Sequence, residues 1–151
     1  MEALRDDFCA ALDSQILLPT SAIVVLRNWD ARLTRQRIDW AVDMLLSRST
    51  PLLLMTYDGN TYEEAVRLKK ILSRTDFSSI TIVTHRSHHY RAYLTFLKVF
   101  GNSIRIYSSP VEDRVDMSKH SVEFRKIEEY IAKGHLATYE EGIVCLNGSL
   151  L

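Results

Sequence analysis

Glycine is scarce in this chain: only five of its 151 residues are glycine. The sequence contains no G-x-G-x-x-G fingerprint, no Walker A loop and no G-x-S-x-G elbow. Because glycine-rich backbone is what wraps a dinucleotide pyrophosphate closely, this shortage argues against a conventional dinucleotide site. Cysteine is scarcer still. Cys9 and Cys145 lie far apart without zinc or C-x-x-C spacing, so we expect both to be reduced thiols.

The chain also lacks a surplus of either charge and a long apolar run. Its 19 basic and 19 acidic residues cancel, so no overall field attracts nucleic acid or an anionic membrane. No stretch approaches the roughly 20 apolar residues of a transmembrane helix, and residues 1–12 carry acids in place of a signal-peptide core. We therefore expect one soluble, cytoplasmic domain over residues 1–151, with no nucleic-acid or membrane partner. Its oligomeric state is left open.

Apolar patterns predict strands and helices in alternation. Short apolar runs indicate buried strands at residues 21–26, 51–56 and 80–84. Residues 104–107 alternate as a fourth strand nearer an edge, and a last short strand is expected at Ile143–Leu146. Helical periodicity runs through Leu4–Leu12, Ile38–Leu46, Tyr62–Leu72, Ala92–Phe100 and Ser118–Lys133. Thr34 or a near neighbour is the expected cap of the second helix, and Gly101 and Gly134 are the expected stops of the last two.

This alternation is typical of a parallel sheet covered by helices on both faces. We predict an α/β fold, namely a Rossmann-like three-layer sandwich with a mostly parallel sheet of four to five strands. In such sheets the carboxyl ends of the strands share one edge, and ligands bind there. The turns expected at this edge are residues 27–30, 56–61 (including the turn Tyr57–Asn60), 84–91 and 108–113.

The third of these turns is the richest in functional groups, because a buried strand ends there in histidine and arginine side chains. Arg91 follows His88 by three residues, which puts both on one helix face. A guanidinium could hold an anion there while the imidazole carries a proton. His88 and His89 point about 100° apart on a helix, which makes them poor joint metal ligands, so we expect no metal site.

The second turn begins a helix with Asn60-Thr61 and has Glu64 three residues after Thr61, which is a capping-box pattern. The backbone N–H groups of a helix start also bind phosphate or carboxylate. We therefore expect a small anionic ligand at this edge of the sheet. The candidate binding residues are Arg27, Asn60, Thr61, Glu64, Thr84, Arg86 and Arg91, and His88 is the candidate acid/base.

Two of these motifs resemble a known family. Residues 82–92 read I-V-T-x-x-x-H-x-x-R-A and residues 60–65 read N-T-x-E-x-A, and both resemble the YdcF/SanA/ElyC family of bacterial proteins. Arg37 with Ala41 is similar to the arginine-containing first helix of that family. The resemblance covers roughly residues 22–110 and is that of a divergent, shortened member. The residues after the first strand are Arg27-Asn28-Trp29, where the family has a glycine-rich turn, and one strand–helix unit is missing.

The resemblance implies a Rossmann-like domain and a nucleoside-containing ligand, either S-adenosylmethionine or another nucleotide. Two functions stay open. The first is binding of an anionic, nucleotide-like or phosphorylated small molecule at the sheet edge, with group transfer or hydrolysis as the chemistry if the protein is an enzyme. The second is a non-catalytic ligand-binding or protein-interaction module that has lost the chemistry of the family.

Overall fold

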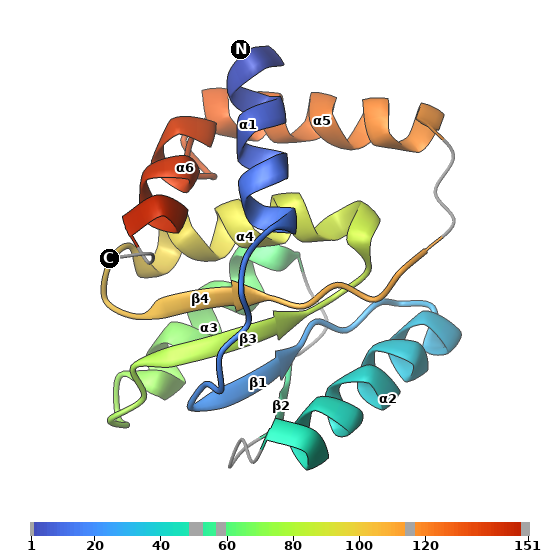
Figure 1. Cartoon of the computed structure of the whole chain (residues 1–151), viewed down its shortest axis with the longest axis vertical. Coiled ribbons are helices and arrows are strands. Elements are labelled where there is room, and N and C mark those ends of the chain that lie inside the picture. Colours follow the sequence, from blue (N-terminus) through green and yellow to red (C-terminus); the bar gives the residue numbers. More distant parts are fainter. Residues whose placement is uncertain (1, 49–52, 57–59, 114–116, 149–151) are drawn as a thin grey trace.

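Parallel strands at the centre of the molecule carry helices on both faces (Figure 1). The computed structural model describes residues 2–48, 53–56, 60–113 and 117–148. Within these segments, four strands pair in parallel in the order β2-β1-β3-β4. The strands are β1 (Ala22–Val25), β2 (Leu53–Met55), β3 (Ser79–Val83) and β4 (Arg105–Ser108). The helices are α1 (Glu2–Asp13), α2 (Ala31–Arg48), α3 (Thr61–Leu72), α4 (Arg86–Phe100), α5 (Met117–Ala132) and α6 (Tyr139–Gly148).

The two central strands are buried on both sides, as expected for a parallel sheet, and Thr81 is the one polar residue among positions 22–25 and 80–83. In β1, Ile23 and Val25 face α2, and Val83 of β3 joins them in that part of the core. Val24 and Ile82, which are register partners, belong to the larger core on the opposite face. The predicted α/β fold with a Rossmann-like, helix-covered parallel sheet is confirmed.

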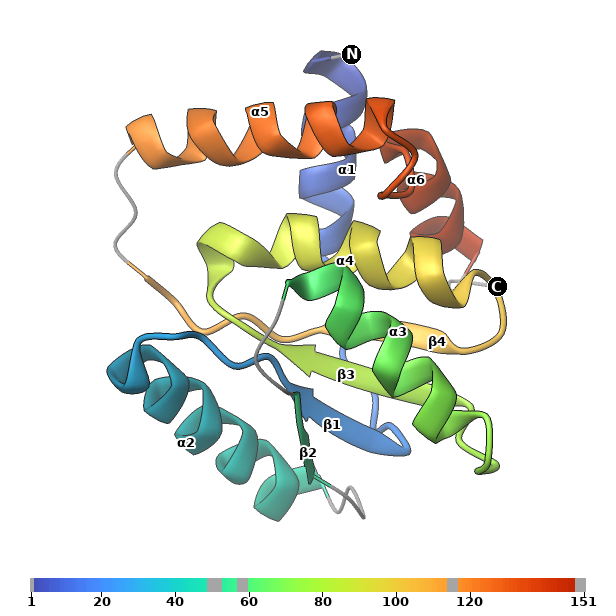
Figure 2. The same cartoon turned by 180° about the vertical axis from the view of Figure 1, so that it is seen from behind.

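The helices lie in three layers around this sheet (Figures 1 and 2). Helix α2 covers one face, and α3 and α4 lie side by side on the other. Helices α1, α5 and α6 form an additional outer layer against α4, with α1 and α6 packed along each other. Because α4 is covered by the sheet on one side and by these helices on the other, most of its side chains are buried.

A chain of polar contacts joins the end of α1 to the end of β4. Asp13 accepts hydrogen bonds from His89 Nε2 at 3.1 Å and from the Tyr90 hydroxyl at 2.7 Å. His89 Nδ1 lies 3.1 Å from Ser108 Oγ. Since a carboxylate only accepts, Nε2 carries the proton and Nδ1 accepts from the serine. Burial lowers the pKa of His89, and the imidazole is therefore a neutral link between α1 and the sheet.

The predicted last strand at Ile143–Leu146 is wrong, because these residues belong to α6. The helix starts with a reciprocal cap: Glu141 N donates to Thr138 Oγ1 at 3.1 Å, and Thr138 N donates to Glu141 Oε2 at 2.7 Å. Gly142 lies against the ring of Phe8 in α1, where a β-carbon would come within 2.8 Å of two ring atoms. The apolar run Ile143–Leu146 therefore lies in a helix that packs closely on α1.

Most of the other predicted boundaries agree with the structure. Gly101 ends α4 with φ 58° and Gly134 follows α5 with φ 76°, both in the left-handed region. Helix α2 begins earlier than its apolar stripe, and Leu46, expected inside, is exposed. Parts of the predicted strand 51–56, the turn 57–60 and the loop beyond Asp113 lie outside the described residues.

Cys9 and Cys145 are free thiols, and burial raises the pKa of Cys9 to about 12. Of the helices in the described segments, none has the length and apolar character needed to cross a bilayer.

Candidate functional site

A cleft of about 1160 Å³ opens at the carboxyl edge of the sheet. It lies beyond β1 and β3, neighbouring strands from which the chain turns to opposite faces, into α2 and α4 respectively. Open α/β sheets form their ligand crevice at such a switch in strand order. All four of the expected turns contribute residues to the cleft, and α5 adds Glu123.

The structure brings six of the candidate residues to this cleft and leaves two outside it. Those that line it are Arg27, Asn60, Thr61, Glu64, His88 and Arg91. Arg86 does not line the cleft, and its guanidinium contacts Glu112 and Asp13. Thr84 is fully buried, and its hydroxyl has no hydrogen-bond partner among the described residues.

The turn between β1 and α2 forms one wall of the cleft and is braced by its own side chains. Asn28 N donates to Thr34 Oγ1 at 2.9 Å, and that hydroxyl donates back to Asn28 O at 2.7 Å. Asp30 N donates to Asn28 Oδ1 at 2.8 Å, and Arg32 N donates to Asp30 Oδ1 at 2.9 Å. Asp30 is therefore the cap of α2, while Thr34 holds the preceding turn in place.

At the inner side of the cleft, Arg37 joins the ends of β1 and β3. Its side chain is only 3% exposed; Nη1 donates to Leu26 O at 2.6 Å and Nε donates to His85 Nδ1 at 2.9 Å. A guanidinium only donates, so His85 must accept at Nδ1 and carry its proton on Nε2, which lies 2.9 Å from Gln36 Oε1. Burial lowers the pKa of Arg37 to about 10, and the group remains a cation at neutral pH.

A second guanidinium–imidazole pair lies on α4 and links α3 to α5 across the cleft. Thr61 Oγ1 lies 3.2 Å from His88 Nε2, and Arg91 Nη2 donates to His88 Nδ1 at 2.9 Å. Arg91 also donates through Nε and Nη2 to the two carboxylate oxygens of Glu123, both at 3.1 Å. The same rule as for His85 puts the proton of His88 on Nε2, directed at Thr61.

The charges of these hydrogen-bonded side chains follow from their burial and from their partners. Burial, reinforced by the neighbouring Arg91 cation, lowers the pKa of His88 to about 4. Burial alone would raise the pKa of Glu123, but the two hydrogen bonds and the positive charge of Arg91 outweigh it and lower that pKa to about 2. At neutral pH the site therefore contains a neutral imidazole, and the Arg91 guanidinium lies between that imidazole and the Glu123 carboxylate.

At the start of α4, an acidic side chain of the protein itself already occupies the place where an anion would bind. Asp113 accepts from Ser87 N at 3.3 Å and from the Ser87 hydroxyl, which satisfies the helix N-terminus. The start of α3 differs. Asn60 is its cap and accepts from Glu63 N at 2.8 Å, while the Thr61 hydroxyl is directed at His88. The predicted capping box between Thr61 and Glu64 is therefore wrong.

Sequence reasoning missed several residues of the cleft. Arg37 entered only through the family resemblance, yet it sits one helical turn before buried Ala41, and this position on the inward stripe was a readable signal. His85 and Glu123 gave no such signal, because their roles depend on segments that are distant in sequence. The rim also carries Trp29, whose side chain lies almost entirely in solvent.

In the described part of the chain, no three His, Cys, Asp or Glu side chains gather as a metal-binding group. No protein-family model matches the sequence, and no curated protein is significantly similar to it. The resemblance to the YdcF/SanA/ElyC family therefore stays a prediction that depends on the motifs at residues 60–65 and 82–92.

Proposed function

We propose that this protein binds a small anionic molecule, phosphorylated or nucleotide-like, in the cleft at the carboxyl edge of the sheet. The observation that carries the proposal is the position of the cleft, at the switch in strand order between β1 and β3. A volume of about 1160 Å³ is ample for a ligand of nucleotide size.

Local donors, not an overall positive field, support the anionic character of this ligand. The cleft is lined by four arginines and five acidic residues, so its charges nearly balance. The acids Asp113 and Glu123, however, are already bound by Ser87 and Arg91. The N-terminus of α3 at Thr61 and the Arg32 side chain on the exposed rim are therefore the groups that we expect to meet a phosphate.

The hydrogen bonds of His88 favour binding without proton transfer over group transfer or hydrolysis. A general base needs a free lone pair and a pKa near the working pH. Here Arg91 donates to Nδ1, Nε2 carries a proton, and the pKa is about 4. Acid–base catalysis by His88 would require the imidazole first to release Arg91, so we favour the non-catalytic form of the function.

Thermal unfolding with a panel of pyrophosphate, ribose 5-phosphate, ADP and S-adenosylmethionine tests the proposal. A ligand at 100 times its Kd stabilises the folded state by about 2.7 kcal/mol, or about 5–10 °C for a chain of this size. Arg32→Glu should weaken binding about tenfold, because it reverses a charge at the cleft. Arg67→Glu is the matched control, since Arg67 is also an exposed arginine on a helix but does not line the cleft.

If no compound on the panel raises the melting temperature, the proposed function is wrong. Equal weakening by Arg32→Glu and Arg67→Glu would instead contradict the placement of the site. Turnover of any bound compound separates the two forms of the function. Conversion that is lost in His88→Gln would contradict the non-catalytic form and assign the chemistry to His88.

A further inference from the structure

The side chain of Trp29 is 95% exposed, although it belongs to the lining of the cleft. An indole is the largest apolar side chain, and leaving it in water forfeits the free energy that its burial would provide. The other tryptophan, Trp40, is partly covered and donates from Nε1 to Ser109 Oγ at 3.0 Å. Trp40 thus has a role in packing that Trp29 does not have.

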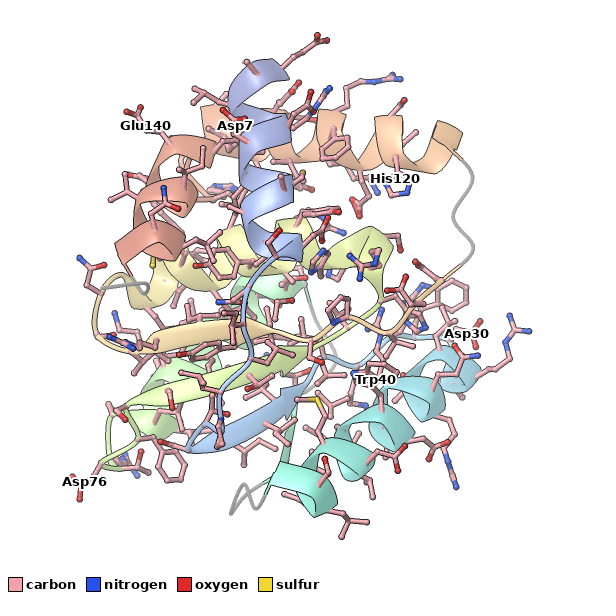
Figure 3. All side chains as sticks on the ribbon, in the orientation of Figure 1. Asp7, Asp30, Trp40, Asp76, His120 and Glu140 are labelled. Carbon is pink, nitrogen blue, oxygen red and sulfur yellow. The ribbon has the colours of Figure 1, made fainter. Side chains whose placement is uncertain are left out.

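The residues on both sides of Trp29 are held by hydrogen bonds. Its neighbours Asn28 and Asp30 are bonded to each other, Asn28 is bonded twice to Thr34, and Asp30 caps α2. Asp30 marks this position at the outer end of α2 in Figure 3. These bonds involve the side chains of Asn28, Asp30 and Thr34 together with backbone groups, so any residue at position 29 would allow them. The fold therefore does not account for a tryptophan here.

The chemistry around the indole fits a planar, charged ligand. Arg27 and Arg32, two and three residues away, line the same cleft. An exposed aromatic face stacks on a nucleobase, and every base offers a π-face to it. Guanidinium groups at the same opening suit the phosphates of the same molecule. A bare phosphorylated sugar would use the arginines but not the indole.

We propose that Trp29 is the stacking platform for the base of a nucleotide, and that the ligand of the cleft is therefore a nucleoside phosphate. This inference rests on the proposed function, because it identifies the ligand class of the same cleft. The base lies on the indole at the rim, and the phosphates extend along the arginines toward the start of α3.

Calorimetric titration of the intact chain with AMP, ribose 5-phosphate and pyrophosphate tests the assignment. AMP differs from ribose 5-phosphate only by its base, so it should bind at least about tenfold more tightly, which is the scale of one base–aromatic stack. Trp29→Ala should abolish this preference while leaving the affinity for ribose 5-phosphate unchanged. Trp29→Phe, which keeps an aromatic face, should retain most of the preference.

Fluorescence gives an independent readout, because the chain has only two tryptophans. In Trp40→Phe the tryptophan emission comes from Trp29 alone, and AMP should quench it while ribose 5-phosphate should not. Should Trp40→Phe fail to fold, the calorimetric comparison decides the matter alone.

The possible outcomes separate this inference from the proposed function. If AMP and ribose 5-phosphate bind equally, or if Trp29→Ala keeps the preference for AMP, the stacking role is overturned while the anion site stands. If none of the three compounds binds, the stacking role and the proposed function are both overturned. A tryptophan exposed for a protein partner would give the first of these results.

Discussion

The contact between Arg91 and Glu123 allows a sharp test of how α5 is held to the site. Glu123→Gln keeps the size of the side chain and removes its charge, so Arg91 loses a partner that it contacts through two parallel N–H groups. The two side chains are only 21% and 17% exposed. Glu129→Gln is the matched control in the same helix, because Glu129 pairs with Lys133 where both side chains are more than half exposed.

The magnitude follows from the pKa of Glu123, which is lowered from 4.5 to about 2. Each pH unit corresponds to about 1.4 kcal/mol, so the fold favours the ionised carboxylate over the neutral group by about 3 kcal/mol. Two charge-assisted hydrogen bonds lead to a similar figure. We expect Glu123→Gln to lower the free energy of unfolding by about 2–3 kcal/mol, and Glu129→Gln by less than about 0.5 kcal/mol.

Urea denaturation near neutral pH measures both changes, provided that the slopes of the two transitions agree. A loss below about 1 kcal/mol in Glu123→Gln, or equal losses in the two variants, would refute the reasoning. Acid provides a second check. Because the folded-state pKa of Glu123 is depressed, its contribution is complete above pH 4.5 and is lost as the pH falls toward about 2. The acid sensitivity of Glu123→Gln should be smaller in that window.

Two further predictions concern the imidazole of the cleft and the packing of the outer helices. Because the pKa of His88 falls from 6.5 to about 4 on folding, stability should drop as the pH is lowered through that window; the loss is about 2 kcal/mol near pH 5. Urea titrations across that pH range should show that His88→Gln lacks this loss of stability. Identical pH profiles for the variant and the parent would contradict the prediction. Gly142→Ala should lower the melting temperature, because its β-carbon would meet Phe8 at 2.8 Å and Leu94 at 3.1 Å; overpacking costs about 1–3 kcal/mol against about 1 kcal/mol gained in helix propensity. Gly148→Ala, with nothing within 4 Å, should be neutral or stabilising, and a rise for Gly142→Ala would show that Phe8 gives way.

The sheet and the location of the cleft could be predicted because parallel strands carry a continuous signal. Residues 22–25 and 80–83 are buried on both faces, so these runs are apolar except for Thr81. Once the strands are parallel, the turns that follow them must share an edge. That reasoning brings Arg27, Thr61 and His88 together without any knowledge of side-chain contacts.

The partners within the cleft could not be predicted, because they depend on how distant helices pack. His88 and Arg91 were expected to face an anion jointly, whereas Arg91 donates to His88 and to Glu123 of α5. Local signals also competed with one another. Ile143–Leu146 has the apolar, partly β-branched composition of a strand, but the capping box at Thr138 determines a helix.

The packing of α1 along α6 has a consequence for the order of folding. Each strand–helix–strand unit of the sheet closes over a short stretch of chain, whereas α1 and α6 are separated by almost the whole described sequence. Contacts of such sequence separation carry the largest loop-closure entropy and form late. During synthesis α1 can therefore meet α6 only at the end. The Phe8 ring can pack against Tyr90 and Tyr93 of α4 before then, but the side that faces Gly142 stays uncovered until α6 arrives.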